Sequence, residues 1–165
     1  MGTFAVQIAK VLGAHVTAVC STRNVDMARS LGADEVIDYT RRDFTRGGQR
    51  YDLILDVAAN RSLMACRRVL STTGRLVIVG AADGRHTAPI VARLVAAIAM
   101  SRFSSQKMLP FLARNSKEDL IFLGELIGAG KVTPVIDRTY PLSETAAAIR
   151  YLEGGHARAK VVITM

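Results

Sequence analysis

Residues 2–20 read GTFAVQIAKVLGAHVTAVC, and they carry the clearest secondary-structure pattern of the chain. The apolar residues of this stretch recur at the spacing of one helix face: Phe4, Ile8, Val11 and Leu12. Gly13 follows where a helix commonly ends. Residues 15–20 are short, β-branched and almost wholly apolar, which is typical of a parallel strand covered on both faces. The stretch therefore predicts a helix followed at once by a buried parallel strand.

The same alternation continues along the chain. Further strands are predicted over residues 35–38, 52–56, 76–79, 107–113 and 160–163, with an extended stretch over 132–140. Helices are predicted over residues 24–31, 62–70, 89–100 and 117–129, with a last helix that Ser143 opens as its N-cap. Gly74 is expected in the turn before residues 76–79. Strands that alternate with helices predict an α/β fold with a doubly wound parallel sheet and helices on both faces.

Length and composition limit the class of protein. The chain has 165 residues, of which 50% are hydrophobic and 22% charged, as in one packed globular domain. The N-terminus has no basic region ahead of an apolar stretch, so no secretory signal is predicted, and the apolar run over 94–101 is too short to span a membrane. Cys20 and Cys66 are too few for a disulfide framework, which favours a reducing compartment. We therefore expect a cytoplasmic protein.

The net charge of +8 raises the question of a nucleic-acid partner. The basic residues are scattered along the chain and few aromatic residues lie among them. This pattern favours a generally basic surface over a nucleic-acid interface.

No self-contained catalytic set is visible. His15, His86, His156 and the two cysteines show no metal-ligand spacing, so no metal site is predicted. No tyrosine is followed four residues later by lysine, which argues against a short-chain dehydrogenase. The sequence has neither a G-x-S-x-G elbow nor a P-loop, so an α/β-hydrolase or a P-loop enzyme is not supported either. No catalytic residue is assigned.

The first helix and the strand after it have the order of the second half of a dinucleotide-binding βαβ unit. In such a unit the unpaired N–H groups and the positive dipole of the helix N-terminus bind a pyrophosphate, here at Gly2 and Thr3. Gly2 would be the last glycine of G-x-G-x-x-G, whose earlier glycines and first strand would lie upstream of Met1. The alternative is that Gly2 is a terminal glycine with no such role.

The end of the predicted strand carries more information about the cofactor. An NAD site usually has an acidic residue there, whereas an NADP site has small polar and basic residues. Cys20 is followed by Ser21, Thr22 and Arg23, so two hydroxyls and a guanidinium are available to a 2′-phosphate. These residues predict NADP(H), although Arg23 could equally be a solvated loop arginine.

Several blocks of the chain resemble the cofactor-binding half of the medium-chain dehydrogenase/reductase superfamily, in its zinc-free quinone oxidoreductase-like branch. The blocks are residues 2–10 with 13–14, residues 31–39, 51–56 and 74–77, and the tail segments 130–132, 140–142 and 160–163. The resemblance covers essentially the whole chain.

The resemblance implies further site residues. Tyr39 would join Ser21 and Arg23 around the adenosine 2′-phosphate, unless it is simply an aromatic residue at the edge of the sheet. Strand ends at Asp56-Val57-Ala58 and Val79-Gly80-Ala81 would border the nicotinamide and its ribose. The implied reaction is hydride transfer from NADPH to a quinone or conjugated carbonyl substrate.

The chain also departs from this family. It contains no GroES-like catalytic domain, no first strand and little of the glycine-rich turn, so we expect an incomplete Rossmann-like NADP-binding domain over residues 1–113. Residues 114–165 would be a C-terminal segment that packs on the catalytic domain in the family. Without the first strand, the sheet is expected to open between residues 15–20 and 52–56. Either these two strands close up or another chain fills the gap.

Loss of the catalytic domain would also leave apolar surface without a partner. The affected face is expected to include Leu120, Leu123, Leu126 and Ile127. This predicts a homo-oligomer or a partner chain that supplies the missing domain. Smaller departures are Ala59, where the family commonly has glycine near the nicotinamide, and Arg158-Ala159-Lys160, where Gly-Lys is common.

The leading hypothesis is an N-terminally truncated, nucleotide-binding portion of an NADPH-dependent oxidoreductase, inactive on its own. One rival is a non-enzymatic module that binds a nucleotide or single-stranded RNA through arginines. The arginines concerned are Arg23, Arg41, Arg42, Arg46 and Arg50. Another rival is a scaffold remnant that survives by assembling with other chains. RNA binding that NADPH does not displace would favour the first rival, and an aggregated product without ligand response the second.

Overall fold

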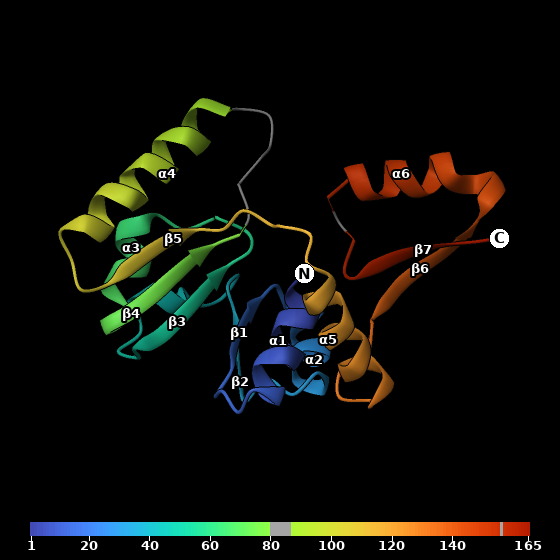
Figure 1. The fold of residues 1–165 in the computed structure, drawn as a ribbon, viewed down its shortest axis with the longest axis horizontal. Helices are drawn as coiled ribbons and strands as arrows, with labels where there is room; N and C mark the ends of the chain where they lie inside the picture. Colours follow the sequence, from blue (N-terminus) through green and yellow to red (C-terminus); the bar gives the residue numbers. More distant parts are fainter. Residues whose placement is uncertain (80–86, 156) are drawn as a thin grey trace. The chain divides into compact units, whose positions relative to one another are not determined.

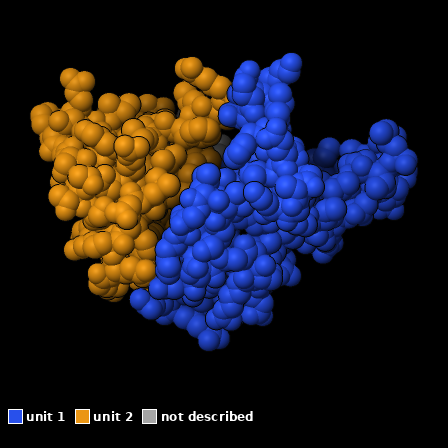
Figure 2. Space-filling view, turned by 60° about the horizontal axis from the view of Figure 1, so that its bottom comes forward, with its two compact units in different colours: residues 1–42, 116–165 blue, residues 43–115 orange. Residues whose placement is uncertain are grey.

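The computed structural model describes residues 1–79, 87–155 and 157–165. The chain forms two compact units, residues 1–42 with 116–165 and residues 43–115 (Figure 2). Each unit combines parallel strands with helices, which confirms the predicted α/β class.

The first unit opens with the predicted helix and strand, but the strand is only partly covered, since Val19 is 40% exposed. The elements of this unit up to residue 42 are α1 (Gly2–Val11), β1 (Thr17–Cys20), the 3-10 turn η1 (Thr22–Asn24), α2 (Val25–Ser30) and β2 (Glu35–Asp38). β1 and β2 are parallel, in a register that pairs Cys20 with Asp38. Gly13 and Gly32 follow α1 and α2 with φ of 79° and 96°, a left-handed conformation that ends each helix at little cost for glycine.

The C-terminal part of the first unit contains a second parallel pair. Its elements are α5 (Lys117–Gly128), β6 (Ile136–Pro141), the 3-10 turn η3 (Leu142–Glu144), α6 (Thr145–Glu153) and β7 (Lys160–Thr164) (Figure 1). Gln7 of α1 is 8% exposed and exchanges two hydrogen bonds with the backbone of Thr133, at 2.7 and 3.0 Å. A buried amide therefore connects α1 to the segment after α5.

The second unit holds a three-stranded parallel sheet. Its elements are the 3-10 turn η2 (Phe44–Arg46), β3 (Tyr51–Asp56), α3 (Leu63–Arg68), β4 (Leu70–Ile78), α4 (Thr87–Arg102) and β5 (Lys107–Pro110) (Figure 1). The strand order is β3-β4-β5. Leu76 and Met108 are paired across β4 and β5 and are almost fully buried, in one cluster with Cys66 of α3 and Ala97 of α4. The core of this unit lies on that face of the sheet.

The described ladders leave β1 and β3 as edge strands, because they join only β1 to β2, β3 to β4 to β5, and β6 to β7. The sequence raised the possibility that residues 15–20 and 52–56 close up against each other. These two segments belong to different units, so this expectation stays a prediction.

Three local predictions were wrong. Ser143 lies inside η3, whose 3-10 turn precedes α6, and the N-cap of α6 is Glu144, without a side-chain hydrogen bond. Gly74 lies within β4, at an irregularity in its pairing with β3, where an added Cβ would lie 2.9 Å from the carbonyl oxygen of Tyr51. The apolar face of α5 was expected to be uncovered, but Leu126 on this face is only 6% exposed. The chain turns back after α5, where the N–H groups of Lys131 and Val132 donate to the carbonyl of Leu126. Leu120 of the same face is 67% exposed.

Candidate functional site

The loop after β1 and the turn after β2 lie side by side. The two strands are parallel, and the backbone N–H of Tyr39 donates to the carbonyl of Cys20 at 3.0 Å. This register brings Ser21, Thr22 and Arg23 to the same sheet edge as Tyr39, the carboxyl edge where ligands bind in folds of this kind. The side chain of Tyr39 is partly exposed at this edge.

Asp38, the last residue of β2, connects this loop to this turn. One carboxylate oxygen accepts the hydroxyl of Thr22 at 2.6 Å, and the other accepts the backbone N–H and the hydroxyl of Thr40 at 2.9 and 2.7 Å. The guanidinium of Arg41 lies 3.6 Å away, and the Asp38 side chain is only 12% exposed. The hydrogen bonds, that of Thr22 first, lower the pKa of Asp38. Asp38 is therefore ionised near neutral pH, and these hydrogen bonds stabilise its negative charge.

The Asp38 contacts bear on the predicted role of Thr22. A hydroxyl has one hydrogen, and that of Thr22 is directed to Asp38 rather than away from the protein. Ser21 N-caps η1 and its hydroxyl oxygen accepts from the side chain of Asn24 at 3.4 Å. A shallow hollow of about 330 Å³ adjoins the loop. It is lined by Thr22, Val25, Asp26, Arg29, Val36, Asp38 and Arg41.

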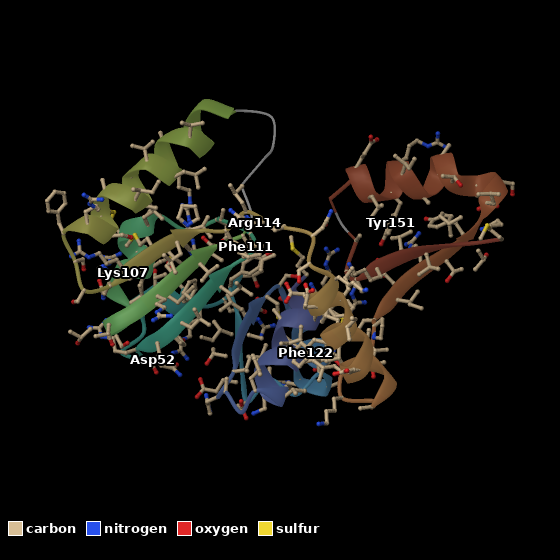
Figure 3. All side chains as sticks on the ribbon, viewed as in Figure 1. Asp52, Lys107, Phe111, Arg114, Phe122 and Tyr151 are labelled. Carbon is tan, nitrogen blue, oxygen red and sulfur yellow. The ribbon has the colours of Figure 1, made fainter. Side chains whose placement is uncertain are left out.

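Arg158 reaches the same loop from the C-terminal part of the chain. Its Nε donates to the side-chain oxygen of Asn24 at 3.0 Å, and one terminal nitrogen donates to the carbonyl of Arg23 at 2.7 Å. Its backbone N–H donates to Asp137 of β6. Asp137 also accepts the hydroxyl of Tyr151, which is labelled at α6 in Figure 3, at 2.7 Å. The hydrogen bond from Tyr151 lowers the pKa of Asp137. Two C-terminal elements thus hold the arginine at the loop.

The predicted pyrophosphate residues stand at the start of α1. Phe4 and Ala5 are the first residues whose N–H groups form hydrogen bonds within the helix, both to the carbonyl of Met1. The N–H groups of Gly2 and Thr3 therefore precede the hydrogen bonds of the helix. A Cβ at position 2 would meet no described atom within 4 Å. Any need for glycine at Gly2 would therefore come from a ligand and not from the fold.

Asp56, at the carboxyl end of β3 in the second unit, is enclosed by an ion pair. One of its oxygens accepts Arg93 of α4 at 2.7 Å, and the other accepts the N–H of Ala59 at 2.8 Å. Arg93 also donates to the carbonyl of Arg61 at 2.7 Å. The Arg93 and Asp56 side chains are 20% and 11% exposed.

Ala59 has a backbone conformation that favours glycine. Its φ is 53°, in the left-handed region, which costs a non-glycine residue roughly 1 kcal/mol or more. The departure noted in the sequence, alanine where the family commonly has glycine, is thus accommodated with strain, and the hydrogen bond to Asp56 helps to hold it.

The other residues predicted to border the nicotinamide lie in the second unit or outside the described residues. Val57 and Ala58 follow β3, and Val79 follows β4 with its N–H bonded to the carbonyl of Asp56 at 3.0 Å. Gly80 and Ala81 lie outside the described residues.

The arginines proposed for RNA binding do not form one patch within a unit. Arg23, Arg41 and Arg42 belong to the first unit, whereas Arg46 and Arg50 belong to the second. Arg41 pairs with Asp38 and Arg46 pairs with Asp43 at 3.9 Å. Carboxylates thus offset part of this positive charge.

Metal ligands do not gather in the part of the chain that the structure describes. No three His, Cys, Asp or Glu side chains there are placed to hold an ion. Burial raises the pKa of Cys66 to about 11, so this thiol stays protonated and is a poor ligand. Nor is any described helix long and apolar enough to cross a bilayer.

The sequence is similar to that of known oxidoreductases. A profile of a family described as zinc-binding dehydrogenase matches residues 31–163. The mouse mitochondrial NAD(P)H oxidoreductase RTN4IP1 is 35% identical over 100% of this chain and 45% of its own length. The chloroplast envelope quinone oxidoreductase homolog of Arabidopsis thaliana is 32% identical over 99% of this chain and 49% of its own length.

The fold is similar to that of solved structures as well. The quinone oxidoreductase from Coxiella burnetii superposes with a TM-score of 0.79 at 26% identity, over 99% of this chain and 49% of that protein. The chain therefore spans about half the length of the relatives that it matches.

Proposed function

The chain belongs to the zinc-binding dehydrogenase family, and on this premise we propose that it is the nucleotide-binding portion of an NADPH-dependent oxidoreductase of the quinone oxidoreductase type. The names of its relatives, NAD(P)H oxidoreductase and quinone oxidoreductase, support this reading and agree with the resemblance found in the sequence. The proposed reaction is hydride transfer to a quinone or another conjugated carbonyl compound.

The observation that carries the proposal is the loop after β1. Its residues Cys20 to Asn24 include no carboxylate, and the nearby Asp38 already accepts three hydrogen bonds. Arg158 adds positive charge to the loop. A site of this composition favours a phosphate over the bare ribose hydroxyl that an acidic residue would bind.

Each unit contains residues that the sequence predicts to contact the cofactor. Ser21, Arg23 and Tyr39 would bind the 2′-phosphate, and Gly2 and Thr3 the pyrophosphate. The ends of β3 and β4, at Asp56-Val57-Ala58 and Val79-Gly80-Ala81, would border the nicotinamide.

When bound, NADPH supplies the hydride, so the protein has to bind and orient it rather than provide the reactive group. Asp38 would contribute by keeping the loop and the turn in one hydrogen-bonded arrangement. The Asp56–Arg93 pair would contribute by fixing the end of β3. We assign no catalytic acid or base to this chain.

The residues that the structure describes form no site that fits zinc. The family description includes the metal, but the described side chains offer no group of three ligands, and the thiol of Cys66 is buried and protonated. We derive no step through a metal ion.

We further propose that residues 1–113 form the incomplete NADP-binding domain and residues 114–165 the segment that packs on a catalytic domain. We also propose that the protein forms a homo-oligomer or binds a partner chain. Cys20 and Cys66 are both free thiols, in keeping with a reducing compartment such as the cytoplasm. The mitochondrial and chloroplast relatives make the interior of an organelle the alternative.

A fluorescence titration tests the cofactor proposal. The emission of NADPH is followed as the purified chain is added, and the same titration is made with NADH. We expect saturable binding of NADPH and at least about tenfold weaker binding of NADH, a difference of about 1.4 kcal/mol. Equal affinity for both would contradict the 2′-phosphate site.

Two further measurements test whether the chain is active alone and whether it binds RNA instead. Because the chain spans only about half of its relatives, we expect no quinone-dependent NADPH oxidation above the protein-free rate. Salt-sensitive binding of a single-stranded RNA oligonucleotide that NADPH does not displace would favour the RNA-binding module instead.

A further inference from the structure

We propose that Arg158 is a specificity-determining residue of the nucleotide site, whose guanidinium binds the adenosine 2′-phosphate at the loop after β1. The inference rests on the proposed NADPH-binding function and adds a residue that sequence reasoning did not assign to it.

The position of Arg158 is fixed by contacts on both sides of the side chain. Its guanidinium makes two hydrogen bonds to the loop, to the carbonyl of Arg23 and the side chain of Asn24. Its backbone N–H is held by Asp137 at 3.0 Å, and Asp137 is in turn held by Tyr151. An arginine bound at both ends loses little further side-chain entropy when an anion binds.

The charge of Arg158 is not neutralised by its loop partners. Both acceptors, a backbone carbonyl and a side-chain amide oxygen, are uncharged. Within the described ranges no carboxylate lies within 4 Å of its guanidinium nitrogens; Asp137 binds the backbone N–H, and its carboxylate attracts the Arg158 charge only at longer range. Other arginines near the loop differ in this respect, since Arg29 pairs with Asp26 and Arg41 with Asp38.

The geometry of the guanidinium leaves donors for a ligand. Arginine has five N–H groups, and the two bonds to the loop use two of them. A phosphate accepts paired N–H groups from one guanidinium, which gives strong and directional binding. Because the carbonyl of Arg23 fixes one terminal nitrogen, the remaining donors lie at the loop that carries Ser21 and Arg23. Arg158 therefore favours a nucleotide with a 2′-phosphate over one without it.

Calorimetry with two small nucleotides tests the inference directly. Adenosine 2′,5′-bisphosphate carries the 2′-phosphate and 5′-AMP lacks it, so the ratio of their affinities reports that phosphate alone. We expect R158Q to weaken binding of the bisphosphate about tenfold or more and to change binding of 5′-AMP by less than about twofold. R158K keeps the charge without the paired donors and should show an intermediate loss.

R150Q is the matched control, because Arg150 is an exposed arginine of α6 in the same unit and its removal changes the net charge equally. It should leave both affinities within about twofold of the unmodified chain. Thermal melts of each variant verify that the fold is retained.

The outcomes separate this inference from the function on which it rests. If the unmodified chain binds the bisphosphate and R158Q binds it equally well, NADPH binding stands and the role of Arg158 is wrong. Equal weakening of both nucleotides by R158Q would show that the residue only supports the loop. If the unmodified chain binds neither nucleotide, the nucleotide site itself is refuted, and the inference with it.

Discussion

Asp38 and Asp56 each end a parallel strand, and the comparison of their surroundings separates two kinds of enclosed carboxylate. Their side chains are 12% and 11% exposed, so the two are nearly equally enclosed. Asp38 accepts hydrogen bonds from two threonines within its own sheet edge, and its arginine is 78% exposed. Asp56 instead faces Arg93, a largely buried arginine of α4.

The difference lies in what remains when the carboxylate is removed. Around Asp38 the partners left behind are hydroxyls and a backbone N–H close to solvent, which water can satisfy. Beside Asp56 the partner left behind is a largely buried guanidinium whose Nε atom has no hydrogen-bond partner among the described residues. The first carboxylate therefore organises a loop, whereas the second is required for the stability of its unit.

The largest effect is expected from Asp56→Ala. Loss of the carboxylate leaves the Arg93 charge buried without a partner, so the free energy of unfolding should fall by about 3–5 kcal/mol. Urea denaturation followed by circular dichroism measures it. Asp52→Ala is the control, because Asp52 is exposed on the same strand, and it should change stability by less than about 0.5 kcal/mol (Figure 3). A loss below about 1 kcal/mol in Asp56→Ala would contradict the comparison.

A double variant tests whether the unpaired charge of Arg93 causes this loss of stability. Replacing Arg93 by methionine in the Asp56→Ala background removes the unpaired charge while keeping an unbranched apolar chain. The double variant should recover about 1–2 kcal/mol relative to Asp56→Ala alone, because the two residues are coupled. Additive losses in the same denaturation experiment would mean that the ion pair is not the source of the effect.

Acidification should affect Asp38 through its protonation. Its pKa is lowered in the folded state by the hydrogen bonds from Thr22 and Thr40, so its stabilising contribution is present above the unfolded pKa of about 4. The contribution is lost as the pH falls through the folded pKa. Asp38→Asn should therefore melt below the unmodified chain at pH 6, and the gap in Tm should narrow towards pH 3. A gap that stays constant over this range would exclude ionised Asp38 as its cause, and Asp52→Asn controls for the loss of one exposed carboxylate.

The smallest effect is expected at Thr22. Its hydroxyl donates to Asp38, so Thr22→Val should weaken NADPH and NADH binding by the same factor, no more than about threefold. The ratio of the two dissociation constants, measured by titration of cofactor fluorescence, should stay unchanged. A selective loss of NADPH affinity would instead mean that this hydroxyl turns to the 2′-phosphate when the nucleotide binds.

Local patterns predicted most of the fold. β2 was predicted at residues 35–38, as observed, and α5 was predicted with an error of one residue. Both predictions succeeded because an apolar strand between turns and a helix with one apolar face produce patterns among residues close together in the sequence. The failures at Ser143 and Gly74 have local causes that the pattern does not contain. A 3-10 turn precedes α6, and a strand irregularity encloses the glycine.

The contacts that define the candidate site could be predicted from the sequence only in part. Ser21, Arg23 and Tyr39 were proposed because each follows a predicted strand, and the ends of parallel strands meet at one edge. Arg158 contacts Asn24 across 134 positions, and Gln7 contacts Thr133 across 126. Such pairs follow from how helices and strands pack, and no spacing along the chain indicates them.

A thermal melt of the purified chain with NADPH or NADH at matched concentrations tests whether the loop after β1 selects the 2′-phosphate, because a ligand that binds only the folded state raises its Tm. We expect a clear rise in Tm with NADPH and a much smaller one with NADH, since only NADPH has the phosphate that the loop after β1 would bind. Equal rises with both cofactors, or no rise with either, would contradict this expectation.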